Sequence, residues 1–242
     1  MSLALQICHY LVWFPLAILV LSAILRCGVR RYPLIFTYMT VTFLLAVAEM
    51  PSSLSVRGSH RTDAQMALHY TLYAVGQGLI HLLIFAVVVS FVLRTTEKSP
   101  IRHVIRTVLA IGGPLFILIS FIVHYDGTAA MNWMPLWNRD LNFCAAIVDM
   151  VLWAFLLSSQ KKDETLLLLV GGMGIGFAGD AITDAVRSIA IHYHTHAVWV
   201  SAWVFSIFAD GASLYVWWQA FRRAPQATPS AFVQPAVNGA AK

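Results

Sequence analysis

Apolar residues dominate seven long stretches of the chain, and short polar segments separate them. The stretches cover approximately residues 3–25, 33–50, 65–93, 104–124, 141–159, 165–191 and 197–221. A helix of about 20 residues crosses the roughly 30 Å hydrocarbon core of a bilayer. Because lipid offers the backbone no hydrogen-bond partner, stretches of this length must be helical to cross it. The pattern therefore predicts an all-α, polytopic membrane protein with a seven-transmembrane-helix bundle over residues 1–223.

The composition supports a membrane protein and excludes several soluble classes. Hydrophobic residues make up 59% of the 242 positions and charged residues only 11%, whereas ordinary soluble domains are about 25% charged. Too few charged side chains are present to cover a water-exposed surface, so a soluble enzyme and a nucleic-acid-binding protein are excluded. Residues 224–242 are rich in Ala and Pro, and we expect them to form a disordered cytoplasmic tail.

The positions of Lys and Arg between the apolar stretches predict the orientation. If the first loop is cytoplasmic, eleven Lys and Arg residues lie inside: Arg26, Arg30, Arg31, Arg94, Lys98, Arg102, Arg106, Lys161, Lys162, Arg222 and Arg223. Only four lie outside: Arg57, Arg61, Arg139 and Arg187. Because cytoplasmic loops carry the excess of positive charge, the N-terminus is predicted outside and the C-terminus in the cytoplasm. Five tryptophans, Trp133, Trp137, Trp199, Trp217 and Trp218, are predicted to be interfacial anchors.

Ionisable side chains inside the apolar stretches are the strongest functional signal. Four of them lie at similar depth near the middle of their stretches: His81, Asp149, Asp180 and Asp210. Asp184 follows Asp180 by one turn, and Glu49 lies nearer the outer end of the second stretch. Each such group costs at least about 2.5 kcal/mol at the bilayer centre, so it normally faces the bundle interior. We therefore expect a polar site at the midplane that binds an ion or a polar ligand, or relays a proton.

A purely structural alternative explains the same residues. The buried carboxyl groups are then protonated and form hydrogen bonds between helices. In that case Asp184 simply pairs with Arg187, three residues further along the helix. Similarly, Gly172 and Gly176, four residues apart in the sixth stretch, have the spacing at which two membrane helices approach closely.

Three histidines alternate between the sixth and seventh stretches, at His192, His194 and His196. In an extended segment alternate side chains point the same way, so these imidazoles are candidate ligands for zinc or copper. The alternative is a polar loop that is merely rich in His. No other cofactor is predicted, because the seventh stretch has no Lys for a retinal Schiff base and no catalytic motif is present.

The segment Arg30-Arg31-Tyr32-Pro33-Leu34-Ile35-Phe36-Thr37-Tyr38 resembles the RRFPxFFxY entry to the second span in a family of seven-span membrane proteins of acidobacterial-type genomes. That likeness covers the chain to about Arg223. The family carries no assigned activity, so the resemblance implies a fold and no catalytic residues. The chain is also distantly similar to the seven-span sensory regions of some bacterial histidine kinases. It ends after the seventh span, so the resemblance implies that a signal passes to a separate partner.

Four classes of function remain open at this point. A sensor or receptor-like module ranks first, because the topology and the polar midplane fit ligand binding followed by helix repacking. A proton- or cation-coupled transporter ranks second, since midplane carboxylates suit a relay, although no internal repeat is visible. An accessory subunit of a larger membrane complex ranks third, and a metal-dependent membrane enzyme ranks last.

Overall fold

The computed structural model describes residues 3–27, 29–55, 63–96, 102–125, 127, 130–158, 163–193 and 195–223. Within these ranges the chain forms seven α-helices and one short 3₁₀ turn. The helices are α1 (Leu3–Cys27), α2 (Pro33–Ser55), α3 (Asp63–Thr95), α4 (Arg102–His124), α5 (Ala130–Ser158), α6 (Glu164–His192) and α7 (His196–Arg223), and the turn η1 is Val29–Arg31. Each α-helix is long and apolar enough to cross a membrane. The predicted all-α, seven-helix multi-pass architecture is therefore confirmed.

Two helix boundaries differ from the prediction by more than two residues. Helix α2 does not stop at Pro51 but continues through it to Ser55. Helix α5 begins at Ala130, well before the predicted start, so most of the segment expected as an outer loop is helical.

The early turns of α5 are held against the end of α4. The Asp140 carboxylate lies 2.8 Å from His124 Nε2, and the rings of Trp133 and Phe121 meet edge to face at 5.2 Å. Tertiary contacts of this kind stabilise helical turns that polar composition alone does not predict.

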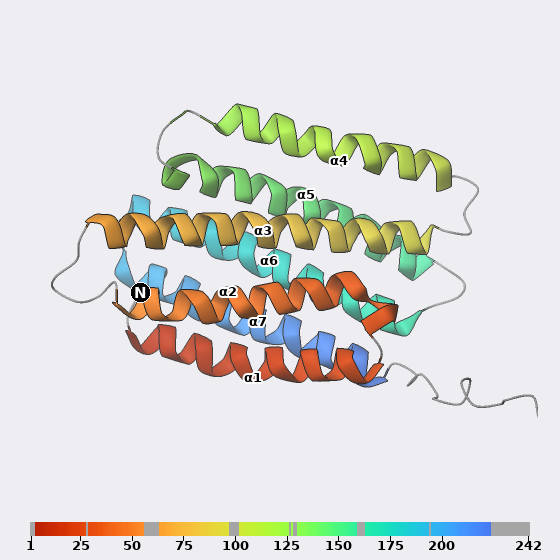
Figure 1. Cartoon of the computed structure of the whole chain (residues 1–242), viewed down its shortest axis with the longest axis horizontal. Helices are drawn as coiled ribbons and strands as arrows, with labels where there is room; N and C mark the ends of the chain where they lie inside the picture. The colour runs from red at the N-terminus through yellow and green to blue at the C-terminus, as the bar shows by residue number, and fades with distance from the viewer. Residues whose placement is uncertain are drawn as a thin grey trace, which may run out of the picture.

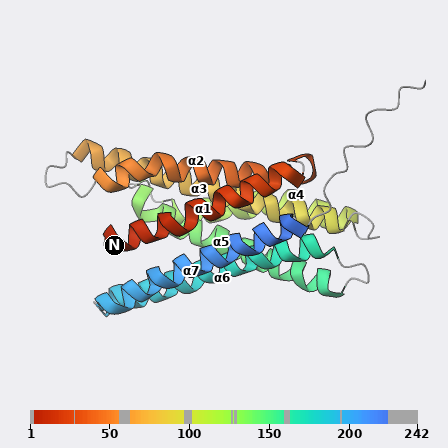
Figure 2. The ribbon, with the colours of Figure 1, turned by 90° about the horizontal axis from the view of Figure 1, so that it is seen from below.

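The helices form two layers that α1 and α5 connect. Figure 1 shows α4 at one edge of the bundle and α1 at the opposite edge. In the turned view of Figure 2, α2 and α3 lie on one side and α6 and α7 on the other, while α1 crosses obliquely. Helix α1 packs against α2 and α7, and α5 packs against α3 and α6. The interior between these six helices is the place where a shared site can form, whereas the described part of α4 packs chiefly against α5 and α3.

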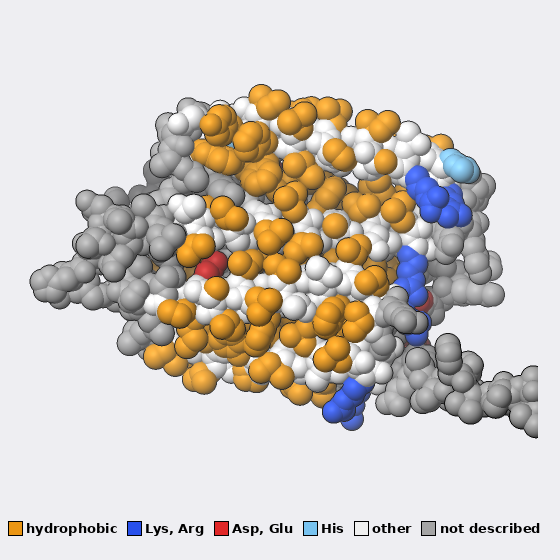
Figure 3. Space-filling model, viewed as in Figure 1, with side chains coloured by type: hydrophobic (Ala, Val, Ile, Leu, Met, Phe, Trp, Pro, Cys, Tyr) orange, Lys and Arg blue, Asp and Glu red, His pale blue; other side chains and the backbone are white. Residues whose placement is uncertain are grey.

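The outer surface of the bundle is apolar. Side chains such as Phe208, Val123 and Met150 are 72%, 71% and 70% exposed, and Figure 3 shows hydrophobic side chains across the middle of one face. A water-soluble protein rarely carries so large an apolar surface. The surrounding hydrocarbon of a bilayer covers it without cost, so the surface fits a membrane environment.

Helices α6 and α7 form the closest seam in the bundle, and glycines make it possible. A Cβ atom at Gly172 would lie 2.5 Å from Trp217 Cδ1, and one at Gly179 would overlap the Ala209 side chain. The seam therefore needs the hydrogen side chain at both positions. The prediction that the glycines of the sixth span let another helix approach closely is confirmed, and the partner is α7.

Basic side chains gather at one end of the bundle, where α1, α3 and α7 end and α2, α4 and α6 begin; we call this the basic end. Its described members are Arg26, Arg31, Arg94, Arg102, Arg106, Arg222 and Arg223. Figure 3 shows Lys and Arg at that end of the visible face. Of the described Arg residues, only Arg139 and Arg187 lie near the opposite end.

Candidate functional site

A cavity of about 140 Å³ lies inside the bundle, and six of the seven helices line it. Its lining residues are Trp13, Tyr38, Gln77, Ile80, His81, Ile84, Asn142, Met173, Gly176, Phe177, Asp180, Asp210, Ser213, Leu214 and Trp217. Helix α4 is the one helix that contributes no described lining residue. Movement of most of the helices relative to one another would therefore change the shape of the cavity.

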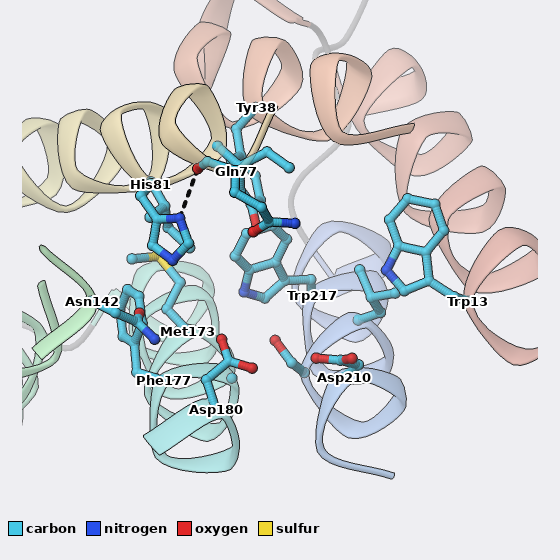
Figure 4. A pocket seen from close by; sticks show the side chains of 15 residues that line it. Trp13, Tyr38, Gln77, His81, Asn142, Met173, Phe177, Asp180, Asp210 and Trp217 are labelled. Atoms are coloured by element: carbon cyan, nitrogen blue, oxygen red, sulfur yellow. Dashed lines mark hydrogen bonds between the residues drawn. The ribbon is translucent and has the colours of Figure 1, made fainter. Parts of the chain in front are cut away.

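Two carboxyl groups face this cavity from neighbouring helices. Asp180 comes from α6 and Asp210 from α7, and both point inward in Figure 4. Asn142 of α5 adds a side-chain amide to the same wall. None of the described lining residues is Lys or Arg. The wall is therefore acidic and has no basic side chain of its own other than His81.

His81 lies across the cavity on α3. Its hydrogen-bond partner identifies the ring nitrogen that carries the hydrogen. Its Nδ1 atom is 2.7 Å from the backbone carbonyl oxygen of Gln77 (Figure 4). A carbonyl oxygen only accepts hydrogen bonds, so Nδ1 carries the hydrogen. In the neutral ring Nε2 is then an acceptor.

Two further polar side chains of the wall use their hydrogens on backbone carbonyls of α6. The Ser213 hydroxyl donates to the Gly172 carbonyl at 2.7 Å. The Trp217 indole N–H donates to the Leu169 carbonyl at 3.0 Å. Both bonds satisfy donors that hydrocarbon would leave unpaired.

Aromatic rings complete the wall. Trp13, Tyr38, Phe177 and Trp217 come from four different helices. The rings of Tyr38 and Trp217 meet edge to face, with centroids 5.8 Å apart. Such rings present electron-rich faces to a cation as well as apolar area to a ligand.

The structure brings together three of the four residues predicted at the midplane. His81, Asp180 and Asp210 share the cavity, whereas Asp149 is not among its lining residues. Asp149 is buried, at 1% exposed, and its Oδ2 would lie 3.1 Å from a Cβ at Gly174 of α6. Its Oδ1 has no hydrogen-bond partner within the described part of the chain.

The two remaining acidic candidates also lie outside the cavity. Glu49 of α2 packs beside α3, where a Cβ at Gly76 would lie 3.1 Å from its Oε1. Asp184 is 52% exposed and lies 3.5 Å from Arg187, which is the pairing that the structural alternative predicted. The Arg187 guanidinium also covers the Trp203 ring of α7 at 3.9 Å.

The histidine cluster stays a prediction. His192 is the last residue of α6 and His196 the first residue of α7, so the two histidines lie on different helices rather than on one extended strand. The side chains of His192 and His194 lie outside the described residues. Among the side chains that are described, no group of three His, Cys, Asp or Glu residues is placed to hold a metal ion.

Most of the uncharged residues that line the cavity were not predicted from the sequence, and one tryptophan was predicted in the wrong place. Trp217, predicted as an interfacial anchor, is 3% exposed and lines the cavity. The helical repeat carried a signal: Gln77 precedes His81 by four residues, and Ser213 and Trp217 follow Asp210 by three and seven. These spacings place each neutral residue on the same face as the ionisable one.

A second cluster connects α1, α3 and α7 with the turn η1 near the basic end. The Tyr32 ring lies between two guanidinium groups, with Arg94 Cζ at 4.8 Å and Arg31 Cζ at 5.6 Å from its centroid. Burial raises the pKa of the Tyr32 phenol, because desolvation disfavours the phenolate. The same ring meets Phe221 of α7 at 5.7 Å, and Cys27 Sγ of α1 lies 2.8 Å from the Phe221 carbonyl oxygen.

Comparisons with known proteins found no relative. No protein-family model matches the chain, and neither the curated proteins nor the solved structures contain a match. The function must therefore be inferred from the cavity and its surroundings.

Proposed function

We propose that the protein is a receptor-like sensor module of the bacterial inner membrane, which binds a small ligand in the central cavity and repacks its helices. The observation that carries the proposal is the enclosure of an acidic cavity by six helices. A ligand that binds one helix arrangement better than another shifts the population toward it. A cavity shared by so many helices offers such differential contacts.

A contiguous path of packed residues supports coupling between the cavity and the basic end. Trp217 lines the cavity, and Phe221 follows it by one turn of α7. Phe221 packs on Tyr32, which lies against Arg94 of α3. Because interiors are densely packed, a shift of Trp217 is passed on to these neighbours. The signal would then reach a partner protein at the basic end.

The distribution of charge supports an N-terminus outside and a C-terminus in the cytoplasm. The described basic side chains gather mainly at the end where α7 finishes, which is the cytoplasmic end by the positive-inside rule. A reporter protein that folds only in the cytoplasm, fused after Lys242, should be active. Activity only when the reporter precedes Met1 would reverse the proposed orientation.

The native thiol at the basic end provides a test of the sensor proposal. Cys27 is buried, whereas Cys8 is exposed and Cys144 is intermediate. A Cys8→Ser, Cys144→Ala variant leaves Cys27 as the single thiol, and its labelling rate by a maleimide reports on the seam between α1 and α7. Small ammonium, neutral and carboxylate compounds are screened for a rise in the midpoint of thermal unfolding. At least one stabilising compound should change the Cys27 rate, and Asp210→Asn should abolish both effects.

The matched control retains Cys144 as the single thiol, because that residue lies on α5 away from the path described above. Its labelling rate should not change when the ligand binds. A compound that binds the cavity while the Cys27 rate stays constant would mean a passive pocket, and the sensor proposal would be wrong.

A proton- or cation-coupled carrier is a second candidate, favoured by the two facing carboxyl groups of Asp180 and Asp210 in the cavity. Carboxylates within the membrane serve as relays in many transporters. The test is flux into proteoliposomes with and without a pH gradient. Flux that Asp210→Asn abolishes and Asp184→Asn leaves unchanged would favour the carrier over the sensor.

A further inference from the structure

We infer that the cavity selects a small organic ammonium ion that carries N–H donors. The inference rests on the proposed function, because it names the class of ligand that the same cavity would bind. Three independent features carry it: the acceptor groups in the wall, the sign of its charge, and its size together with its aromatic lining.

The first feature is the direction of the hydrogen bonds in the wall. The His81 ring carries its hydrogen on Nδ1, which donates it to the Gln77 carbonyl oxygen. Ser213 and Trp217 give their hydrogens to carbonyls of α6. What these groups offer to a ligand is the imidazole Nε2 and the serine lone pairs. A ligand that carries N–H donors can therefore bond to these acceptors as well as to the carboxyl oxygens of Asp180 and Asp210.

The second feature is charge. Asp180 and Asp210 face the cavity, and none of the described residues lining it is Lys or Arg. Ionised carboxylates away from water are costly unless a counter-charge is present. A bound ammonium ion supplies that counter-charge and donates hydrogen bonds to the same oxygens. An anionic ligand would instead meet two groups of its own sign.

The third feature is size and lining. The cavity volume of about 140 Å³ is close to that of an engineered cavity of about 150 Å³ that binds benzene. Trp13, Tyr38 and Trp217 present aromatic rings to this space. Rings within about 6 Å attract an organic cation, and their area also buries its apolar part. A bare metal ion gains little from such a wall, which favours an organic ammonium ion.

The test measures binding of radiolabelled benzylammonium to the full chain in phosphatidylcholine nanodiscs by equilibrium dialysis. Neutral lipid prevents the cation from binding to headgroup charge. Benzyl alcohol and benzoate match the probe in size but are neutral and anionic. Tetramethylammonium keeps the charge but has no N–H donor. Circular dichroism and gel filtration verify that each variant is folded.

We expect saturable binding of one benzylammonium per chain. Benzyl alcohol, benzoate and tetramethylammonium should each bind at least about tenfold more weakly, which corresponds to about 1.4 kcal/mol of binding free energy. Asp180→Asn and Asp210→Asn should each weaken benzylammonium binding about tenfold or more. Asp184→Asn is the matched control, because this exposed acid lies one turn from Asp180 on α6 and outside the cavity. It should weaken benzylammonium binding by no more than about fivefold, because it removes an exposed, ion-paired charge and no group of the cavity wall.

The possible failures are distinguishable. Tighter binding of benzyl alcohol or benzoate, lost in Trp217→Ala, would overturn the ligand class and leave the receptor-like function standing. Equal binding of tetramethylammonium would overturn the donor argument, because charge alone would then decide selectivity. If none of the four compounds binds saturably to folded protein, the ligand class is wrong, and the thermal-unfolding screen with the Cys27 labelling rate decides the proposed function separately.

Discussion

Trp217 of α7 packs directly on Gly172 of α6, and the position of its indole requires glycine there. The indole fills the space where a Cβ atom at position 172 would be, 2.5 Å from Cδ1 and 2.7 Å from Nε1. The same indole lines the cavity and donates to the Leu169 carbonyl. The packing of the seam therefore sets the position of the cavity wall.

Gly172→Ala should destabilise the protein by about 1–3 kcal/mol, because overpacking a dense seam forces side chains and backbone to move. Unfolding in mixed micelles with increasing SDS measures the change. Gly112→Ala is the matched control, since no atom lies within 4 Å of a Cβ at that position of α4. There alanine should be neutral or stabilise the helix by up to about 1 kcal/mol. Equal effects at the two positions would contradict the assigned seam.

Asp149→Leu should stabilise the protein by about 1–3 kcal/mol. The carboxyl group is buried at 1% exposed, and its Oδ1 lacks a partner within the described residues. A buried polar atom without a partner costs about this much, and leucine has a similar shape without polar atoms. Asp149→Asn keeps the polar group and should change stability by less than about 1 kcal/mol. A marked loss of stability in Asp149→Leu would show that the carboxyl group has a role in the bundle.

Arg187→Gln should strengthen benzylammonium binding about fivefold. Arg187 follows Asp180 by seven residues, which is about 10 Å along the helix. A positive charge at that distance opposes a bound cation by about 1 kcal/mol. Arg187→Lys keeps the charge and should bind the cation as the natural chain does, although it loses part of the stacking on Trp203. Weaker binding in Arg187→Gln would contradict the electrostatic argument.

Arg94→Gln should reduce coupling without reducing ligand binding. The guanidinium lies 4.8 Å from the Tyr32 ring centroid and donates to the Arg31 carbonyl at 3.2 Å. Its loss should cost about 0.5–2 kcal/mol of stability and diminish the change in Cys27 labelling on binding. Arg106→Gln removes a charge from the basic end away from Tyr32 and is the control. An unchanged Cys27 response in Arg94→Gln would place the coupling elsewhere.

The fold was predictable because lipid imposes simple constraints on a chain. The length of the apolar stretches predicts seven helices, since an exposed backbone cannot cross hydrocarbon. The extension of α5 to Ala130 was not predictable in this way. That segment mixes apolar and polar residues, and its helix depends on contacts such as the one between Trp133 and Phe121. Contacts between helices are not encoded in the hydropathy of one segment.

The depth of the site residues along their helices was predictable, but the direction in which each residue faces around its helix was not. Counting residues along each helix places His81, Asp149, Asp180 and Asp210 at one level. The structure shows that three of them face the cavity, while Asp149 faces α6 elsewhere. Which side of a helix meets which neighbour depends on packing, and a single sequence does not give the helix order.

The hydrogen bonds of Ser213 and Trp217 have a consequence for how this protein can evolve. These two bonds join α6 to α7 and also use donors that would otherwise face the cavity. A substitution of Ser213 or Trp217 should therefore change ligand preference and bundle stability together. Such positions are constrained by both requirements at once. Asp210 and Gln77 line the cavity without contributing a side-chain bond to that seam, so new specificities should arise first at these positions.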